Sequence, residues 1–230
     1  MVFQDLVEGI FIKRYKRFLV DVRLMDGQVI TAHCTNSGSL KSAIKEGAPV
    51  MLSKSSNPKR KTKYTWEMIQ INGTWVGVNT NNANILAYEF VRDGLIELLP
   101  RYNVLRREMK FYNSRLDLYA ENANEKVFIE VKNVTLKEGR YAKFPDAKTL
   151  RGQKHLQTLI KAIEEGYRAI MLYIVQRTDT EIFSPAEEID PVYSALLKEA
   201  YNRGVEIIPI QVKITPSEAS FYRILPFELN

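Results

Sequence analysis

The pattern of apolar residues changes near residue 80, and this change restricts the possible folds more than any other feature. Before it, short stretches rich in Ile, Val, Leu and Phe follow one another, and the hairpin dipeptides Asp26-Gly27 and Asn72-Gly73 join two pairs of them. After it, stretches with apolar residues at helical spacing alternate with apolar strand segments. The pattern predicts an all-β domain at residues 1–80 and a domain of α/β class at residues 81–230.

The strand segments of the first domain predict a small barrel. One or two helical turns are expected at Leu40–Lys45, and strands are expected at residues 9–15, 17–25, 28–33, 49–53, 64–71 and 74–78. Five or six short strands with a helical insert after the third are typical of an OB-type barrel. An SH3-like barrel would show similar strands, so it stays open as the alternative to the OB-like barrel that we expect.

The excess positive charge of the chain lies in the first domain. The net charge is +6, residues 1–80 hold 12 basic and 6 acidic side chains, and residues 81–230 hold 21 of each. Two basic clusters, one at the first turn and one in the loop before Tyr64, are candidate nucleic-acid contacts: Lys13, Arg14, Lys16, Arg17, Lys54, Lys59, Arg60, Lys61 and Lys63. A charge run is often only a solvated loop. We favour binding to a phosphate backbone because charge, neighbouring aromatic rings and barrel type agree.

Several aromatic residues lie among or beside these charges: Tyr15, Phe18, Tyr64, Trp66 and Trp75. Exposed rings next to a basic groove can stack on bases. Side chains alternate along a strand, however, so about half of these rings are expected to point into the barrel. Most of them are therefore expected to be core residues.

The second domain is predicted to be a mixed sheet with helices packed against it. Helices are expected at residues 85–99, where Pro100 ends the first, at 147–165 and at 192–203. Strands are expected at residues 104–111, 115–119, 127–134, 169–175 and 205–211. The whole chain is thus α/β, or α+β when the barrel is included.

The residues suited to chemistry lie on the second and third strands of this domain. Glu130 and Lys132 are separated by one residue in FIEVKNV, so they project from the same face of a strand. If the adjacent strand places Asp117 opposite Glu130, two carboxylates and an ammonium group converge. Two carboxylates can hold Mg²⁺ or Mn²⁺ for phosphodiester hydrolysis, and the Lys can orient water or stabilise charge. The alternative is an ion pair on an exposed strand.

This arrangement resembles the PD-(D/E)xK nuclease fold. The resemblance assigns Asp117, Glu130 and Lys132 to the motif and makes them candidate catalytic residues, with the two acids as metal ligands. Glu89 resembles the additional metal-proximal acid that some members carry on the first helix. Gln153 or His155 resembles the polar residue that often completes such sites, and we take Gln153 as the candidate catalytic residue. The sequence differs from the pattern because no Pro precedes Asp117.

Longer motifs resemble the sugar fermentation stimulation protein A (SfsA) family over nearly the whole chain. They are AHCTNSGSL, SRLDL, IEVKNVTL, FPDAKTLRGQKHL and AIMLYIVQR. Thr35 stands where this family usually has Pro. The resemblance implies an N-terminal OB-like barrel, a nuclease-like domain, DNA binding without strong sequence preference, and a regulatory role in sugar (maltose) metabolism.

The segment FPDAKTLRGQKHL also has a physical interpretation of its own. Asp146 is expected to cap the following helix. Arg151 and Lys154 are three residues apart and share a helix face, where they can meet a phosphate at the entrance to the metal site. A solvated helix face explains these two cations equally well.

Several protein classes are excluded or disfavoured. Cys34 is the only cysteine, so the chain has no internal disulfide and no CxxC metal site, and a reducing cytoplasm is expected. No apolar run approaches the ~18 residues of a membrane helix, and residues 1–11 do not have the pattern of a signal peptide. No organic cofactor is expected.

The leading hypothesis is therefore a cytoplasmic, sequence-nonspecific DNA-binding protein, for which the resemblance implies a regulatory function in sugar metabolism. The alternative is a Mg²⁺- or Mn²⁺-dependent nuclease that hydrolyses DNA or RNA phosphodiesters through Asp117, Glu130 and Lys132. A third class, a regulator that recognises promoters, would need a recognition helix. The long helices carry buried stripes and lie between strands, and no helix-turn-helix pattern is present.

Overall fold

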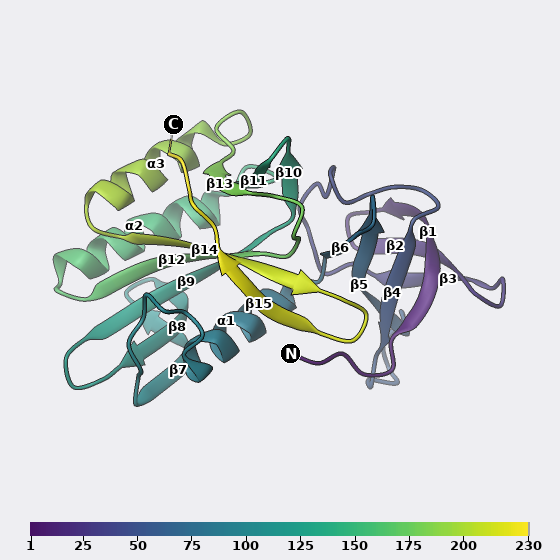
Figure 1. Cartoon of the computed structure of the whole chain (residues 1–230), viewed down its shortest axis with the longest axis horizontal. Helices are drawn as coiled ribbons and strands as arrows, with labels where there is room; N and C mark the ends of the chain where they lie inside the picture. The colour runs from purple at the N-terminus through teal and green to yellow at the C-terminus, as the bar shows by residue number, and fades with distance from the viewer. Residues whose placement is uncertain (230) are drawn as a thin grey trace.

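The computed structural model describes residues 1–229 and shows two β-sheet units in contact. Figure 1 shows a barrel of purple to blue strands on one side and an α/β unit, coloured teal to yellow, on the other. We call strands β1–β6 the barrel, and the elements from α1 to β15 the α/β unit. The division of the chain at residues 80 and 81 stays a prediction.

The barrel is one six-stranded sheet in the order β3-β2-β1-β4-β5-β6. It closes where β3 pairs with β5 in parallel, at His33 and Thr65. Its strands are β1 (Val7–Tyr15), β2 (Leu19–Leu24), β3 (Val29–His33), β4 (Pro49–Lys54), β5 (Tyr64–Ile71) and β6 (Thr74–Gly77). Closure covers the apolar face of every strand, and Phe11, Trp66 and Val50 lie in the resulting core.

The helix expected at Leu40–Lys45 is wrong. Residues 41–42 and 46–47 form two separate turns, closed by hydrogen bonds from Ala43 N to Leu40 O (2.7 Å) and from Ala48 N to Lys45 O (3.2 Å). Leu40 has a φ of 52°, which interrupts helical geometry. Leu40 and Ala43 are both buried in the barrel core, so tertiary packing determines this conformation.

The α/β unit is built on a second six-stranded sheet in the order β15-β14-β12-β9-β8-β7. Its strands are β7 (Val104–Phe111), β8 (Ser114–Glu121), β9 (Lys126–Val134), β12 (Arg168–Val175), β14 (Glu206–Ile214) and β15 (Ala219–Ile224). Its helices are α1 (Asn81–Asp93), α2 (Leu150–Glu164) and α3 (Pro191–Asn202). The central strand β12 runs parallel to β9 and β14, and the other pairs are antiparallel, so the predicted mixed sheet is confirmed.

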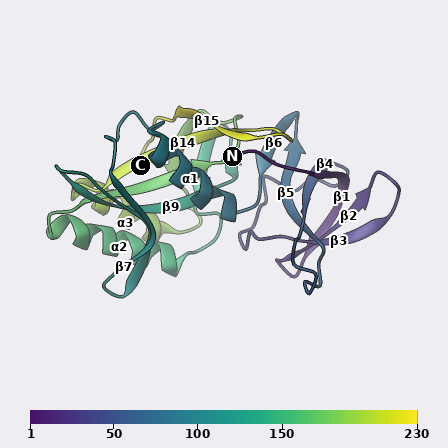
Figure 2. The ribbon, with the colours of Figure 1, turned by 90° about the horizontal axis from the view of Figure 1, so that it is seen from below.

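Helices cover both faces of this sheet (Figure 2). On β12, Met171 and Tyr173 pack on the side of α2 and α3, whereas Ile170 and Leu172 pack on the side of α1. Every residue of β12 after Arg168 is buried. A parallel strand covered on both faces must be apolar throughout, which explains the continuous run AIMLYIV.

Three helix ends differ from the predicted positions by three or more residues. α1 begins at Asn81, four residues before the predicted start at residue 85. α1 ends at Gly94, not at Leu99, because Gly94 adopts a left-handed conformation (φ 62°) and its N–H closes the helix. α2 begins at Leu150, and its N-cap is Thr149, whose side chain accepts a hydrogen bond from Gly152 N (3.0 Å). Asp146 does not cap this helix. Its carboxylate accepts a hydrogen bond from Leu40 N (3.2 Å).

Four short or polar strands were not anticipated from the sequence. Three of them form a small additional sheet, β10 (Leu136–Glu138), β11 (Tyr141–Phe144) and β13 (Ile182–Pro185), and the fourth is the edge strand β15. Segments of three or four residues are too short for a periodic signal. The strand β15, ASFYRI, has exposed Tyr222 and Arg223 side by side, which obscures alternation.

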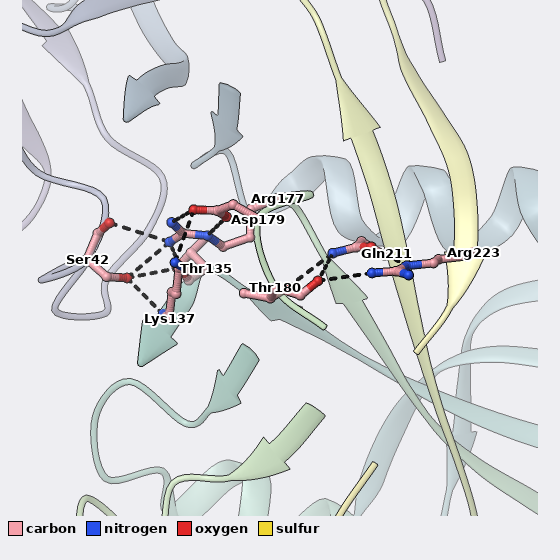
Figure 3. A network of polar contacts seen from close by, with 8 residues as sticks. All are labelled: Ser42, Thr135, Lys137, Arg177, Asp179, Thr180, Gln211 and Arg223. Atoms are coloured by element: carbon pink, nitrogen blue, oxygen red, sulfur yellow. Dashed lines mark hydrogen bonds and ion pairs between the residues drawn. The ribbon is translucent and has the colours of Figure 1, made fainter. Parts of the chain in front are cut away.

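A buried polar network joins the barrel to the α/β unit (Figure 3). Arg177 is 1% exposed, and its guanidinium forms a bidentate pair with Asp179 (2.6 and 2.8 Å). Its Nη1 donates to Thr135 O (2.8 Å) and to Ser42 Oγ (3.2 Å), and Ser42 belongs to the turns that precede β4. The barrel is thus anchored to the α/β unit by charge-assisted hydrogen bonds.

Within residues 1–229, no helix is both long and apolar enough to cross a membrane.

Candidate metal and nucleic-acid site

A cleft of about 500 Å³ lies where the barrel meets the α/β unit. The barrel side contributes Arg17 and the loop at residues 35–38. The α/β side contributes the start of α1, the polar part of β9, and the segment at residues 143–149 that leads into α2. Asp117, Glu130 and Lys132 all line this cleft.

Asp117 lies where β8 and β9 separate. The last backbone pair between the two strands is Leu118 with Ile129, so Asp117 is one residue beyond the ladder, on the side of Glu130. Its carboxylate replaces the missing strand partner by accepting a hydrogen bond from Val131 N (2.8 Å), and Asn84 of α1 donates to its other oxygen (2.8 Å). Burial, reinforced by the nearby charge of Glu130, raises the pKa of Asp117 to about 6.

Glu130 and Lys132 project from the same face of β9, as their spacing predicts. The Glu130 side chain is 2% exposed, and its Oε1 accepts a hydrogen bond from Lys132 Nζ and is hydrogen-bonded to His155 Nδ1. Burial alone would raise the pKa of Glu130, but Lys132 and His155 outweigh it and lower the pKa below its ordinary value. Glu130 is therefore a carboxylate held ionised in a buried position.

The second oxygen of Glu130 is the unusual atom of this site. Glu130 Oε2 is buried and has no hydrogen-bond partner. A buried carboxylate oxygen without a partner loses a large solvation free energy, so such atoms are rare in folded proteins. An oxygen-seeking cation between Glu130 and Asp117 would restore a partner to this atom.

The donor set fits a cation that keeps part of its water. Among residues 1–229, no group of three or more His, Cys, Asp or Glu side chains is arranged to hold a metal ion. Two carboxylates, Asp117 and Glu130, are nevertheless a sufficient protein contribution for Mg²⁺, which binds oxygen and retains several waters. The nitrogen of His155 that faces Glu130 is occupied by that contact, and His155 does not line the cleft, so we do not count it among the ligands.

The structure does not bring two of the sequence-predicted residues into the cleft. Glu89 forms an ion pair with the N-terminal ammonium group (3.0 Å) and does not line the cleft. The Gln153 amide donates to both oxygens of Asp190 (2.9 and 3.2 Å), the residue that caps α3. The polar residue that α2 supplies to Glu130 is instead His155, since positions 155 and 159 of α2 turn toward the sheet.

Asn84 contacts Asp117 and was missed by sequence reasoning. It lies in α1, five residues before Glu89. No spacing rule relates an amide on a helix to an acid on a later strand. The only sequence signal is that Asn84 is a polar residue near the start of a helix.

The basic residues around the first turn have different environments. The Arg14 guanidinium donates to the carbonyl oxygens of Asn36 (2.7 Å) and Gly38 (2.8 Å), so it braces the loop that forms one wall of the cleft. Arg17 lines the cleft, and the exposed Lys16 precedes it in the turn. The Lys13 side chain is 67% exposed, with Nζ 3.9 Å from Asp21.

The cations of the second cluster lie away from the cleft, in and beside the loop between β4 and β5. The side chains of Lys54, Lys59, Lys61 and Lys63 are exposed. Arg60 is half-buried and donates to Thr65 Oγ1 (3.0 Å), and its Nη2 has no hydrogen-bond partner. This cluster is open to a polyanion in solution, whereas Arg14 is engaged within the fold.

The aromatic residues of the barrel are mostly structural, as alternation predicts. Trp66 is fully buried, and its indole N–H donates to Met68 O (3.0 Å). Tyr64 and Trp75 pack against apolar cores. Phe18 is the exception, since it is 48% exposed and stacks on His33.

Two conspicuous sequence segments meet at the cleft. The loop of AHCTNSGSL carries Gly38, and FPDAKTLRGQKHL carries Asp146. A Cβ atom at position 38 would overlap the Asp146 carboxylate, so only glycine allows this close approach. Arg151, from the second segment, also lines the cleft, and Lys154 lies one turn further along α2, where its Nζ donates to Asn113 O (2.7 Å).

Comparison with known proteins identifies both parts of the chain. Residues 12–78 match the family described as SfsA N-terminal OB domain, and residues 81–218 match the family described as Sugar fermentation stimulation protein RE domain. The match decides between the two barrel types in favour of the OB barrel. The fold thus defines a protein in which an OB-type barrel precedes an α/β domain of the RE type, built on a mixed six-stranded sheet.

Full-length relatives agree with this assignment. Proteins described as sugar fermentation stimulation protein homolog are 46% identical to the chain in Geotalea uraniireducens (92% of each protein covered) and in Maricaulis maris (98% of this chain and 97% of the relative). The chain belongs to the sugar fermentation stimulation protein family. A solved structure described as Pyrococcus furiosus SfsA in complex with Ca²⁺ is 28% identical, with a TM-score of 0.89 over 99% of this chain and 98% of the other.

Proposed function

We propose that the protein binds nucleic acid and hydrolyses its phosphodiester bonds with the help of a divalent cation held by Asp117 and Glu130. The observation that carries this proposal is the unpartnered, buried Glu130 Oε2 beside Asp117 in an open cleft. A structural ion pair would be expected to satisfy both oxygens of its carboxylate. The relative described as a complex with Ca²⁺, another cation that prefers oxygen ligands, supports a divalent cation in this family.

The cation is expected to be Mg²⁺ or Mn²⁺, with Asp117 and Glu130 as its protein ligands. The chemistry that such a cation supplies when bound is polarisation of the scissile phosphate and a lower pKa for a bound water. Asn84 and Val131 N fix the direction of the Asp117 carboxylate through their hydrogen bonds. The site is thus oriented by the fold before any ligand arrives, which reduces the cost of reorganisation.

Lys132 supplies the positive charge next to the reacting group. Its side chain is 12% exposed, lines the cleft, and is held by Glu130 Oε1. An ammonium group in this position can orient the attacking water or stabilise the negative charge that develops on the phosphate. His155 acts through Glu130 and is a positioning residue, because it contacts Glu130 Oε1 and does not line the cleft.

The basic residues supply the binding of the phosphate backbone. Arg17 and Arg151 line opposite sides of the cleft, on the barrel and on α2. The exposed cations of the loop before β5 supply a second, separate set of phosphate contacts on the barrel. DNA is the substrate we expect, and the resemblance of the α/β domain to endonucleases is consistent with it.

A nicking assay tests this proposal. Supercoiled plasmid is incubated with the wild-type protein and Mn²⁺, with Asp117→Ala, and with Asp93→Ala as a control that removes an exposed acid outside the cleft. We expect cleavage by the wild type and Asp93→Ala, and a loss of at least ~10²-fold in Asp117→Ala. Equal activity in all three preparations would identify a contaminant and contradict the proposal. Labelled RNA assayed in parallel tests the choice of DNA.

The second candidate function is DNA binding without cleavage, with a regulatory role in sugar metabolism. The observation that favours it is that the exposed loop cations lie outside the cleft, so they can bind a polyanion without the metal site. If all five cations from Lys54 to Lys63 neutralise phosphates, the slope of log K against log salt is about −4 to −5. Binding that is insensitive to salt would contradict this mode. Footprinting on promoter and random DNA then tests regulation, and equal affinity would argue against promoter recognition.

Cys34 bears on the cellular location. It is a free thiol and is buried in the barrel core. A free thiol is compatible with the reducing cytoplasm in which we propose that the protein acts.

A further inference from the structure

A continuous strip of surface leads from the cleft along α2 to the turn between β7 and β8. It consists of two shallow hollows, of which the first adjoins the cleft and the second adjoins the first. Arg151 lines both the cleft and the first hollow, and Asn113 and Lys154 line both the first and the second. The strip therefore begins at the proposed metal site and ends at Tyr112 and Lys161.

The strip is lined by exposed cations with regular geometry. Arg151, Lys154 and Lys161 differ by three and seven positions, so they lie within an arc of ~80° on one face of α2. Arg115, at the start of β8, faces the same hollow as Arg151 and Lys154. From Arg151 to Lys161 the helix rises by ~15 Å, which corresponds to about four steps of a DNA strand.

These cations are poorly neutralised by the protein itself. Within the described chain, none of the three cations on α2 forms an ion pair with a carboxylate: Lys154 Nζ donates to a main-chain carbonyl, and Lys161 Nζ lies 3.4 Å from the centre of the Tyr112 ring. Arg115 Nε is 4.0 Å from Glu108, at the limit of an ion pair. By contrast, the exposed Arg203 at the end of α3 pairs with both Glu164 and Glu199.

We propose that this strip, lined by Arg115, Arg151, Lys154 and Lys161, is a second binding track for the phosphate backbone of DNA, along which the nucleic acid continues beyond the cleft. The proposal rests on the proposed function, since it extends the same site. Residues 81–230 are neutral in total but carry a local positive strip, so the positive charge of the protein is not confined to the barrel. The barrel and the strip would then bind DNA on opposite sides of the metal site.

A charge-removal experiment tests the track. Arg115→Gln, Lys154→Gln and Lys161→Gln are combined, and Arg151 is kept because it lines the cleft. The matched control combines Arg140→Gln, Lys198→Gln and Lys213→Gln, three exposed cations that line neither the cleft nor the strip. A third protein keeps the charge with Arg115→Lys, Lys154→Arg and Lys161→Arg. Binding of a labelled DNA duplex of about 40 base pairs is measured in EDTA at several salt concentrations.

We expect the track variant to reduce the magnitude of the salt slope by about 2.7 and to weaken binding about 100-fold or more near ~0.1 M salt. The control and the charge-keeping protein should retain the wild-type slope. Equal slopes in the track variant and its control would overturn the track, as would a wild type that does not bind the duplex. The nicking assay stays independent: a cleaving wild type whose track variant binds like the control refutes the track alone.

Discussion

Two buried charged clusters lie near the boundary between the barrel and the α/β unit, and they differ in how completely their atoms are satisfied. In the network of Arg177, Asp179 and Ser42, the guanidinium reaches a carboxylate, a carbonyl and a hydroxyl, and no atom of these residues is left buried without a partner. In the cluster of Asp117 and Glu130, one carboxylate oxygen has no partner. The polar atoms of the first cluster are all paired within the fold, whereas Glu130 Oε2 in the second cluster has no partner.

This difference separates a structural role from a functional one without reference to any motif. Removing one partner of a fully paired buried charge is costly, because the other charge is left buried and unpaired. Two neighbouring carboxylates in a buried position repel each other and destabilise the fold, as expected of side chains that hold the proposed cation. Substitutions in the two clusters should therefore have opposite signatures.

The largest effect is expected for Asp117→Asn. This substitution should lower Mn²⁺-dependent cleavage by ~10³-fold, because it removes a metal ligand. In the absence of divalent cations it should raise the free energy of unfolding by about 1 kcal/mol, since Asp117 repels Glu130 and its burial is unfavourable to the ionised form. Nicking assays and urea unfolding in EDTA measure the two effects. A variant that is both inactive and less stable would remove the distinction between the clusters.

The next largest effect is expected for Arg177→Met. It should lower the free energy of unfolding by about 3 kcal/mol, because Asp179 and the Thr135 carbonyl lose their partner. Urea unfolding measures this change, with Arg203→Met as the control, since Arg203 forms only exposed ion pairs worth less than ~1 kcal/mol. If the two variants lost similar amounts of unfolding free energy, the burial of Arg177 would contribute nothing to the stability of the fold.

The same pair predicts the dependence of stability on pH. Burial alone would raise the pKa of Asp179, but the ion pair with Arg177 outweighs it and lowers the pKa below the ordinary value. A lowered pKa in the folded state means that the stabilisation is present above the unfolded-state pKa of ~3.9 and is lost as the pH falls through the lower folded value. Asp179→Asn should cost about 1.5 kcal/mol at neutral pH. Its unfolding free energy should approach that of the wild type in acid, and a constant difference would contradict the assignment.

The smallest effect on the fold is expected for the exposed loop of the barrel. Combining Lys59→Gln, Lys61→Gln and Lys63→Gln should leave the melting temperature unchanged and reduce the magnitude of the salt slope of DNA binding by about 2.7.

Arg14→Gln should lower the stability of the fold and leave the salt slope of DNA binding unchanged, because Arg14 donates to Asn36 O and Gly38 O inside the fold. Its expected cost is about 1–2 kcal/mol of stability with the slope retained. A changed slope in Arg14→Gln would show that this cation binds DNA directly.

Much of the fold was predictable because its signals are local. The hairpin dipeptides and apolar runs give six barrel strands, and the apolar run of β12 gives the central strand. The missed elements depend on tertiary contacts: the turns after Leu40 are fixed by packing, and β10, β11 and β13 are three or four residues long. Short strands acquire their hydrogen-bond partners from distant segments, which local patterns do not contain.

The candidate site was likewise predictable only in part from the sequence. Spacing within β9 predicts that Glu130 and Lys132 share a face, and the structure has this arrangement. The positions of Asn84 and His155 depend on how α1 and α2 pack on the sheet, which the sequence does not state. Gln153 and Glu89 show the same limit, because each is polar and near the right element but pairs elsewhere.

The most direct test of the central claim is the location of Mn²⁺ in crystals of the protein, determined by anomalous diffraction. We predict a peak between the Asp117 carboxylate and Glu130 Oε2, the unpartnered oxygen, and its loss in Glu130→Gln. In the same crystals, the network of Arg177 and Asp179 should bind no Mn²⁺, because its polar atoms are already satisfied. Absence of Mn²⁺ between Asp117 and Glu130, with the cleft accessible, would contradict the account.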